Sequence, residues 1–514
     1  MAILNSLFTW FMKKRIHQIE LFMKYPHDVQ EEWFQSLIST AEATEWGKLY
    51  DYKSIFSVED FKNRVPIQSY DSIKGHVDRM IKGEQNILWP SDIKWFAKSS
   101  GTTSDRSKFI PVSREALEEC HYQGGKDMLS IYCHNRPDNK VFTGKSVVIG
   151  GSSQFNNFSS DSYSGDLSSI LIRNLPFWAE FKRTPTLEVT LNPNFEDKID
   201  QIARITIQED VTSLAGVPTW NLVMAQRILE ITGKQNLLEV WPNLEFYGHG
   251  GVSFKPYREE FKRLIPSAKM YYLENYNASE GYFGIQDQSD SEDLLLMLDY
   301  GIYYEFLPME HIGESNPKTY ALGEVELGKN YALIISTNAG LWRYMIGDTI
   351  KFTSLSPYRF QISGRTTAYI NTFGEELIVD NADQAIQAAS IATGATVKDY
   401  TAAPVYFDGG KAGAHEWIIE FAQQPVCFRE FCEVLDAKLR EINSDYDAKR
   451  YKDMALTFPI IHNAPANTFY HWMKSRGRLG GQNKVPRLAN DRTYLDPILA
   501  EIRVNDQLGR TATL

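Results

Sequence analysis

The chain has 514 residues, of which 43% are hydrophobic and 23% are charged, and this balance excludes a disordered chain. Its 54 lysines and arginines against 65 aspartates and glutamates give a net charge of −11, which argues against a broad nucleic-acid-binding surface. Four cysteines without a C-x-x-C pair exclude a disulfide framework and a zinc ribbon, and they predict reduced thiols in the cytoplasm.

The N-terminus contains an apolar run that ends in three cations, Lys13, Lys14 and Arg15. A secretory signal has the opposite order, and the run is too short to cross a bilayer. We therefore expect an amphipathic helix that packs on the body of the protein, with no membrane attachment. Up to about residue 85 the pattern predicts helices joined by short turns, one of them starting at Ser57.

Between residues 95 and 365, apolar β-type runs alternate with helical patterns, which predicts a layered α/β domain. The predicted strands are 147–149, 214–217, 244–247, 269–273, 294–298 and 332–336. The predicted helices are 113–134, 197–208, 218–232 and 256–265.

After a glycine-containing connection near 365–380 the pattern starts again and is typical of a compact α+β unit. Its predicted helices and strands are 381–392 (helix), 401–407 and 416–422 (strands), 426–443 (helix) and 454–458 (strand), followed by terminal helices. We expect a large N-terminal domain of residues 1–370 and a small C-terminal domain of residues 371–514.

The most informative stretch is residues 98–108, where hydroxyl side chains, a glycine and a lysine stand between two apolar runs. A chain of phosphates requires backbone N–H groups, hydroxyls and a cation, and glycine lets the backbone approach closely. The Walker spacing of phosphate-binding loops, G-x-x-x-x-G-K-[ST], is absent from the sequence. The stretch therefore indicates either a phosphate-binding loop or a polar hairpin loop without a ligand. Its candidate residues are Ser99, Ser100, Gly101, Thr102, Thr103 and Lys108.

A second stretch, residues 271–284, is an aromatic-rich strand followed by a small-residue turn with one carboxylate, Glu280. Ligands of α/β sheets lie at the C-terminal ends of strands. At such a place Glu280 could hold Mg²⁺ against phosphate oxygens, and Tyr276 could stack on a base. The alternative is an ordinary strand exit with a solvated glutamate.

Three shorter features follow. Gly347 and Asp348 end the run 340–348 and could aim a carboxylate at ribose hydroxyls, or could form a common hairpin turn. Gly364-Arg365, at the proposed domain border, is a candidate hinge. Lys484 follows two glycines and could swing into a distant cleft, although most such lysines are simply solvated.

Taken together, these stretches resemble the motifs of the adenylate-forming enzymes, and specifically of the Gretchen Hagen (auxin-responsive) family of acyl acid amido synthetases. The resemblance runs from about Trp33 to the C-terminus. The family's first motif is similar to S-S-G-T-[ST]-x-G-x-x-K-x-I-P and matches residues 99–111, with a departure near Asp105, where many members have glycine. Aspartate tolerates the left-handed conformation, so the turn is compatible with this change.

The later motifs of the family also have counterparts. Y-x-[AS]-S-E-x-x-x-G matches residues 276–284, and G-L-[YW]-R-Y-x-x-G-D matches residues 340–348 with Met345 in place of a frequent arginine. The hinge and final-lysine motifs match Gly364-Arg365 and Lys484-x-Pro486-Arg487. Each motif alone is weak evidence, and five in sequence order are strong evidence.

The resemblance implies an α/β fold with a large N-terminal layered domain of the adenylate-forming type and a smaller, mobile α+β C-terminal domain. It implies an ATP-dependent ligase that activates a carboxylic acid as acyl-AMP, releases pyrophosphate and transfers the acyl group to an amine, which in this family is usually an amino acid. No Ser/His/Asp triad is needed, since a carboxylate is already a nucleophile.

The site residues that the resemblance implies fall into two groups. The catalytic residues are Lys484, from the small domain, and Glu280, which would bind Mg²⁺. The ATP-binding residues are Ser99, Ser100, Gly101, Thr102, Thr103, Lys108, Gly250, Gly251, Tyr276, Ser279, Asp348 and Arg365.

Two alternatives remain open at the level of sequence. One is an adenylating enzyme that transfers the acyl group to a thiol such as coenzyme A, and the other is a nucleotide-binding homologue without turnover. The expected partners are a carboxylic acid and an amine, with no nucleic acid and no membrane, in a monomer or a weak homo-oligomer.

Overall fold

The computed structural model describes residues 2–99, 108–150, 156–159, 162–251, 254, 257–366, 369–370, 375, 377–405, 413–443, 446–447, 450, 456–476, 485–489 and 491–511. The chain divides into two compact units. The first consists of residues 1–346 and 350–361, and the second of residues 347–349 and 362–514. The two units are described separately below.

The first unit begins with helices, as predicted. They are α1 (Ala2–Lys13), α2 (Ile16–Lys24), α3 (Pro26–Ala41), α4 (Glu45–Leu49), the 3₁₀ turn η1 (Tyr52–Ser54), α5 (Val58–Arg64) and α6 (Tyr70–Ile81). The predicted start at Ser57 is confirmed, because its hydroxyl accepts a hydrogen bond from the Asp60 N–H at 3.1 Å and caps α5.

Helix α1 packs on the body of the first unit, which confirms that expectation. The Asn5 side chain donates to the Asn139 carbonyl at 2.8 Å and accepts from the Phe142 N–H at 3.1 Å. Just after the helix, Arg15 forms a buried ion pair with Asp127 at 3.0 Å. Buried polar groups with specific partners fix one arrangement of a helix, because any other leaves them unpaired.

Within the described residues, the first unit contains two sheets. One has eleven strands in the order β12-β13-β14-β15-β11-β10-β9-β8-β7-β3-β6, and the other has four in the order β2-β1-β5-β4. The strands are β1 (Trp95–Ser99), β2 (Lys108–Val112), β3 (Lys145–Val148), β4 (Asn156–Ser159), β5 (Ser162–Gly165), β6 (Arg183–Thr184), β7 (Val211–Ala215), β8 (Phe246–Gly250), β9 (Tyr271–Ala278), β10 (Gly281–Ile285), β11 (Leu294–Leu296), β12 (Ile302–Pro308), β13 (Asn330–Thr337), β14 (Tyr344–Leu355) and β15 (Tyr358–Arg365).

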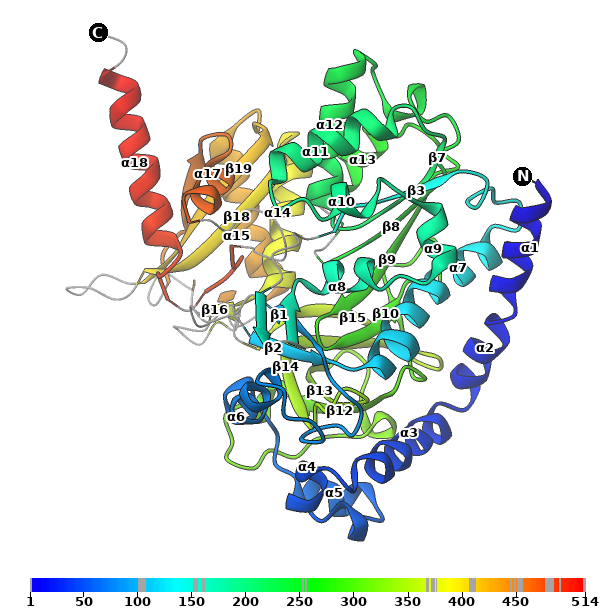
Figure 1. Ribbon diagram of the computed structural model, residues 1–514. Helices are drawn as coiled ribbons and strands as arrows, with labels where there is room; N and C mark the ends of the chain where they lie inside the picture. Colours follow the sequence, from blue (N-terminus) through cyan, green and yellow to red (C-terminus); the bar gives the residue numbers. More distant parts are fainter. Residues whose placement is uncertain are drawn as a thin grey trace. The chain divides into compact units, whose positions relative to one another are not determined.

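Helices cover the part of the large sheet that contains the parallel strands β3, β7, β8 and β9 (Figure 1). They are the π-helical turn η2 (Ala116–His121), α7 (Tyr122–Asn135), α8 (Leu167–Arg173), α9 (Phe177–Lys182), α10 (Leu187–Thr190), α11 (Phe195–Thr206), α12 (Pro218–Thr232), η3 (Leu237–Glu239) and α13 (Arg258–Leu264). Short 3₁₀ turns η5 (Met309–His311) and η6 (Leu322–Glu324) follow.

Two apolar clusters lie on this part of the sheet. Helices α11, α12 and α13 contribute Ile202, Met224 and Phe261 to a cluster that includes Tyr247 of β8. Helix α7 contributes Tyr132 to a different cluster, where its ring lies 4.5 Å from that of Phe246. Successive residues of a strand point to opposite faces, so both faces of β8 are covered, as parallel sheets require.

The second unit has the predicted α+β content. Its elements are β16 (Tyr369–Ile370), β17 (Leu377–Ile378), α14 (Val379–Thr393), β18 (Thr396–Val405), β19 (Ala414–Gln423), α15 (Phe428–Ile442), β20 (Ile460–Ala464), α17 (Thr468–Ser475) and α18 (Leu495–Thr511). Within the described residues, β18, β19 and β20 form one sheet in that order.

The strand predicted at 454–458 falls only partly on described residues, since 451–455 lie outside them. Leu456 forms an isolated parallel bridge with Gly413, and the Thr457 N–H donates to the Gly413 carbonyl at 2.8 Å. The regular strand β20 of this sheet runs from Ile460 to Ala464, later in the chain than predicted.

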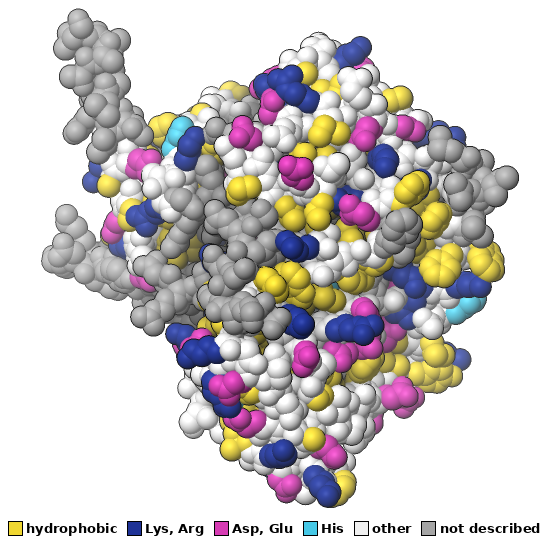
Figure 2. All heavy atoms as spheres, in the orientation of Figure 1, with side chains coloured by type: hydrophobic (Ala, Val, Ile, Leu, Met, Phe, Trp, Pro, Cys, Tyr) yellow, Lys and Arg dark blue, Asp and Glu magenta, His cyan; other side chains and the backbone are white. Residues whose placement is uncertain are grey.

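The surface carries charges of both signs. On the face drawn in Figure 2, basic and acidic side chains are interspersed among small apolar areas. Among the described helices, none combines the length and the apolar composition that crossing a membrane requires.

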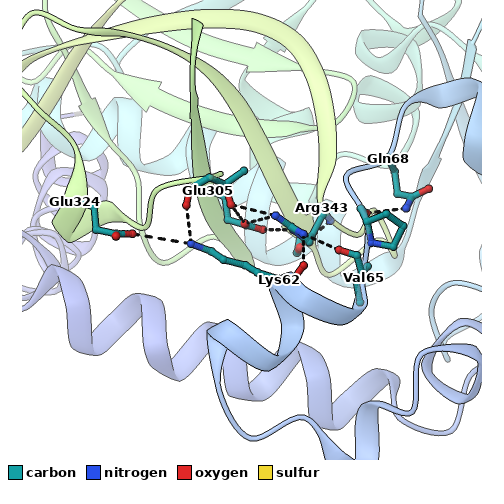
Figure 3. A network of polar contacts seen from close by, with 9 residues as sticks. Lys62, Val65, Gln68, Glu305, Glu324 and Arg343 are labelled. Atoms are coloured by element: carbon teal, nitrogen blue, oxygen red, sulfur yellow. Dashed lines mark hydrogen bonds and ion pairs between the residues drawn. The ribbon is translucent and has the colours of Figure 1, made fainter. Parts of the chain in front are cut away.

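A buried arginine joins the N-terminal helices to the large sheet (Figure 3). The Arg343 guanidinium donates to both carboxylate oxygens of Glu305, at 2.9 and 3.0 Å. It also donates to the carbonyls of Lys62 at 2.8 Å and Val65 at 2.6 Å, and to the Thr319 hydroxyl at 3.0 Å. All five N–H groups of a guanidinium are thereby used. Arg343 and Glu305 are 3% and 1% exposed.

The same residue fixes the start of β14. Arg343 has a φ of +43°, which is unfavourable for a residue with a side chain. Its carbonyl accepts from the Gln68 N–H at 2.9 Å, and the Met345 N–H donates back to the Gln68 carbonyl at 2.9 Å. The hydrogen bonds of the side chain and backbone together hold this turn at Arg343, four residues before Gly347.

We expect Arg343→Met to lower the free energy of unfolding by about 3–5 kcal/mol, because it leaves the Glu305 carboxylate buried without its cation. Arg204→Met is the control, since Arg204 pairs with Asp200 on the surface at 59% exposure, and its loss should cost less than about 1 kcal/mol. Urea unfolding followed by tryptophan fluorescence measures both. Equal losses in the two variants would contradict the importance of the buried pair.

Candidate functional site

Four neighbouring parallel strands end together at one edge of the large sheet. Strands β3, β7, β8 and β9 pair in this order, all in the same direction. Three of them end at glycine: Gly150 follows β3, Gly216 follows β7, and Gly250 closes β8. We call this edge, with the turn that follows β9, the carboxyl edge. It is where open α/β sheets bind ligands.

The glycines at the carboxyl edge meet two physical requirements. Gly216 and Gly251 have φ angles of +128° and +79°, which other residues rarely adopt. A Cβ on Gly250 would lie 2.4 Å from the Asn275 carbonyl oxygen on β9 and would force the two strands apart. Of the predicted site residues, Gly250 therefore keeps the backbone of β8 close to β9, and Gly251 allows the turn of the backbone that follows.

A two-residue turn ends β9. Ala278 pairs with Gly281 across the β9–β10 hairpin, so Ser279 and Glu280 form the turn between the strands. Ser279 is 3% exposed, and its hydroxyl has no hydrogen-bond partner among the described residues. Glu280 is half-buried beside it. A buried unpaired hydroxyl next to a carboxylate is a ready donor or acceptor for a polar ligand.

Tyr276 lies two residues before the end of β9 and is mostly covered. Its ring lies 4.9 Å from that of Phe283 and 6.2 Å from that of Phe360, and the residue is 7% exposed. The tyrosine therefore forms part of the apolar core under the turn. Its contact with a base stays a prediction.

The sequence did not single out two histidines near the carboxyl edge. His121, at the end of the π-helical turn η2, has its Nδ1 2.9 Å from the Asn277 side-chain oxygen, and burial lowers its pKa to about 4. Burial lowers the pKa of His249, which stacks on Phe254 at 3.9 Å, to about 3. Both are neutral at pH 7. No spacing in the sequence marks the contact of His121, because its partner Asn277 is 156 residues away in the chain.

The predicted phosphate loop connects β1 to β2. Strand β1 ends at Ser99 and β2 begins at Lys108, and these two residues pair across the antiparallel hairpin. Ser100, Gly101, Thr102 and Thr103 lie outside the described residues. The hairpin thus brings two of the predicted ATP-binding residues side by side at the base of the loop.

The second unit contains the remaining predicted residues. Asp348 lies within β14 and is 8% exposed, so the sequence interpretation of a hairpin turn at this point is wrong. Gly347 lies within the strand with φ +91°, and its carbonyl accepts from the Thr366 N–H at 2.8 Å. Arg365 ends β15, with its side chain outside the described residues, as is the whole of Lys484.

In the part of the carboxyl edge that the structure describes, the Glu280 carboxylate is the candidate ligand for a metal ion. Among the described residues no cluster of three or more His, Cys, Asp or Glu side chains could hold a metal. Mg²⁺ is often bound by one or two carboxylates together with substrate phosphates and waters. The single half-buried carboxylate of Glu280 fits that mode and does not fit an ion held by protein alone.

Solved structures show the class of fold. The chain is similar to the GH3.15 acyl acid amido synthetase, with a TM-score of 0.78 and 16% identity over 95% of this chain and 96% of that one. It is also similar to 2-hydroxyisobutyryl-CoA ligase in complex with 2-HIB-AMP, with a TM-score of 0.59 and 12% identity over 93% of this chain and 91% of that one. The fold is therefore that of the adenylate-forming ligases, as the motifs implied.

Family domains cover most of the chain. The GH3 family N-terminal domain matches residues 15–270, the GH3 family central domain residues 295–365 and the GH3 family C-terminal domain residues 380–493. The chain belongs to the GH3 family, which confirms the resemblance found in the motifs.

Relatives of known name support the same assignment. The indole-3-acetic acid-amido synthetase GH3.4 of Arabidopsis thaliana is 24% identical over 95% of this chain and 92% of its own length. The jasmonoyl–L-amino acid synthetase JAR4 of Nicotiana attenuata is 24% identical over 65% of this chain and 68% of its own length.

The buried histidine beside β9 predicts a pH effect on stability. The unfolded chain takes up a proton at His121 near pH 6.5, whereas the folded protein does so only near pH 4, so lowering the pH through this window favours unfolding. His121→Gln keeps a donor for Asn277 and removes this proton uptake. We expect the wild type to lose up to about 1.4 kcal/mol more unfolding free energy per pH unit than the variant.

Urea unfolding at pH values from 7 to 4.5 measures this difference. The control is His17→Gln, because His17 is 88% exposed, and this variant should follow the wild-type profile. Parallel pH profiles for the wild type and His121→Gln would contradict a neutral buried His121.

Proposed function

We propose that this protein is an ATP-dependent ligase that joins a carboxylic acid to an amine, with an amino acid as the amine. The observation that carries the proposal is the carboxyl edge of a GH3-family sheet, where close-approach glycines meet a turn with one carboxylate, Glu280. Relatives support the choice of amine, since their names describe amido synthetases and a benzoate–glutamate ligase.

The reaction has two steps. An oxygen of the substrate carboxylate attacks the α-phosphorus of ATP, the bond to the β-phosphate oxygen breaks, and pyrophosphate leaves. The amine nitrogen then attacks the acyl carbonyl carbon, the bond from that carbon to the phosphate oxygen breaks, and AMP leaves while the nitrogen loses a proton to water. Neither step needs a protein nucleophile, so the protein contributes positioning and charge neutralisation.

The roles that we propose for the ATP-binding residues follow the chemistry of each side chain. Ser99, Ser100, Gly101, Thr102 and Thr103 donate hydroxyl and backbone N–H groups to the β- and γ-phosphates, with Lys108 as a supporting cation. Gly250-Gly251 and Tyr276 flank the adenine, and the buried Ser279 hydroxyl gives the nucleotide a polar contact. Asp348 accepts from the ribose hydroxyls, and Arg365 lies near the ribose or phosphate.

We propose that Glu280 holds Mg²⁺ together with the phosphates. The ion, when bound, neutralises negative charge on the leaving pyrophosphate. The chain itself determines where the ion would bind. The β9–β10 turn places Glu280 at the sheet edge, and the pairing of β8 with β9 fixes the position of Glu280 relative to Gly250.

We also propose different roles for the two domains. Residues 1–370 bind ATP and the acid. Residues 371–514 act as a lid that brings Lys484 to the α-phosphate during adenylation and moves away before the amine attacks the acyl-adenylate. Gly364-Arg365 is the proposed hinge. A lysine near the α-phosphate stabilises the charge that develops there, and such an interaction is worth several kcal/mol in a water-free site.

The acid-dependent exchange of labelled pyrophosphate into ATP tests the proposed function. We expect exchange with at least one carboxylic acid from a panel that starts with aromatic acids, including indole-3-acetic and 4-substituted benzoic acids, because two named relatives act on these classes. Adding amino acids should then yield amide product. Exchange followed by product only with coenzyme A would contradict the amine, and no exchange with any acid would contradict the ligase.

Two substitutions test the proposed catalytic residues. Glu280→Gln and Lys484→Ala should each slow exchange by about 10² to 10³, because each removes a charge that stabilises the transition state. Both should leave the melting temperature within a few degrees of wild type. The matched controls are Glu326→Gln and Lys474→Ala, which change exposed residues of the same type and should exchange within twofold of wild type. Equal rates in variants and controls would contradict these roles.

A further inference from the structure

The π-helical turn η2 contacts both strands of the β9–β10 hairpin just below the turn Ser279-Glu280. The His121 Nδ1 atom lies 2.9 Å from the Asn277 side-chain oxygen on β9. The Tyr282 N–H of β10 donates to the Cys120 Sγ atom at 3.2 Å. Asn277 and Tyr282 lie opposite each other across the hairpin, each two residues from the turn. Two neighbouring residues of η2 therefore bind both strands at the same level of the hairpin.

The strand ladder alone gives this turn limited support. Below the turn the hairpin has two regular pairs, at Ala278 and Asn277 of β9. The register then shifts between Tyr282 and Gly284, where β10 has one extra residue. A bulge of this kind interrupts the hydrogen bonds of the ladder locally and bends the strand. The tip of the hairpin therefore depends on contacts from outside the ladder, and η2 supplies two of them.

Hydrogen bonds at both ends hold η2 itself on the sheet. The Ser113 hydroxyl accepts from the Ala116 N–H at 2.9 Å and donates to the Asn338 carbonyl at 2.7 Å. The Asn338 side chain donates to the Glu119 carboxylate at 3.2 Å. Ser113 and Asn338 are both buried. Because such bonds are costly to leave unmade, η2 has one favoured arrangement beside the hairpin. π-Helical turns are rare and occur frequently at functional sites.

The contact between His121 and Asn277 has a defined direction. An amide oxygen only accepts hydrogen bonds, so the Nδ1 atom of the neutral imidazole carries the proton and donates it. His121 is 4% exposed. Helix α7, which continues η2, packs closely on the same hairpin, since a Cβ on Gly124 would lie 2.4 Å from the Tyr282 ring. Removing the imidazole leaves the half-buried Asn277 oxygen without this donor and lets the hairpin adopt other positions.

We propose that His121 is a positioning residue for adenylation: through Asn277 it holds the Ser279-Glu280 turn where the Glu280 carboxylate meets the magnesium ion of ATP. This inference rests on the proposed function. Mg²⁺ demands nearly octahedral geometry, so a carboxylate displaced by about 1 Å no longer fits its coordination sphere. His121 contributes no atom to the reaction and acts through Asn277. All of these residues belong to the first unit.

The experiment compares His121→Leu, which removes the donor, with His121→Gln, which keeps one, and with a control, Tyr52→Phe. Tyr52 is 1% exposed, and its hydroxyl accepts from the buried Trp46 Nε1–H at 3.0 Å. Tyr52→Phe therefore also breaks a buried hydrogen bond of the first unit and measures the effect of lost stability alone. Calorimetry gives the dissociation constant of ATP with Mg²⁺ and with EDTA for each full-length protein. Mass spectrometry follows hydrogen exchange of the peptide 277–284.

In the wild type we expect ATP to bind at least about tenfold more tightly with Mg²⁺ than with EDTA, because the Glu280 carboxylate contacts the ion. In His121→Leu this ratio should fall below about threefold, while the affinity for ATP in EDTA stays within about twofold of wild type. The peptide 277–284 should exchange hydrogen faster in this variant. His121→Gln should recover part of the ratio. Tyr52→Phe should keep all of it, even if its melting temperature falls.

The contrary results separate the positioning role from the proposed function. A wild-type ratio in His121→Leu, or an equal fall of the ratio in Tyr52→Phe, would overturn the positioning role alone. Unchanged hydrogen exchange of the peptide 277–284 in His121→Leu would do the same without any reference to nucleotide binding. Equal wild-type affinity for ATP with Mg²⁺ and with EDTA would also overturn it, and acid-dependent pyrophosphate exchange would still support the ligase. Absence of that exchange in the wild type would overturn the proposed function.

Discussion

The arrangement depends first on the parallel pairing of β3, β7, β8 and β9. Parallel strands that share a direction bring all their carboxyl ends to one edge, where glycines stand at or just after three of the strand ends, at Gly150, Gly216 and Gly250. The backbones of β8 and β9 lie so close together that a side chain on Gly250 would collide with the Asn275 carbonyl. The turn Ser279-Glu280 then adds a hydroxyl and one carboxylate at the end of the last parallel strand. The positions of these groups at the carboxyl edge therefore follow from strand direction and residue size alone, without a ligand.

Arginines with several partners fix a segment of the chain in each unit. In the first unit Arg343 uses all of its donors on Glu305, Thr319 and two carbonyls and holds the start of β14. In the second unit Arg487 pairs with Asp383 against Tyr400 and holds the segment after Lys484. A guanidinium suits this task better than an ammonium, because its rigid fork satisfies several acceptors in one orientation. Burial makes the Arg343 anchor specific, since a displaced partner would leave the Glu305 carboxylate without its counter-ion.

Local signals made much of this fold predictable from the sequence. Helix 218–232 coincides with α12, which has proline at its start and Gly233 in a left-handed conformation after its end. The sequence predicted strands that overlap β3, β8 and β9, with starts within about two residues of the observed ones. It also predicted the turn at Ser279-Glu280 and singled out the glycines of β8. Pairings between distant segments could not be predicted. Strands β12, β14 and β15 were missed, and the contact between His121 and Asn277 joins residues 156 apart in the chain. No local sequence pattern predicts such a contact, because the two residues come together only when the sheet forms.

The central claim is that ATP binds at the carboxyl edge of the parallel strands. A crystal structure of the full chain with Mg²⁺ and α,β-methylene-ATP, which resists attack at the α-phosphorus, tests it most directly. The account predicts adenine beside Gly250-Gly251, phosphates against the loop between Ser99 and Lys108, and a magnesium ion on the Glu280 carboxylate. A nucleotide bound at any other part of the chain, with the carboxyl edge occupied only by water, would contradict it.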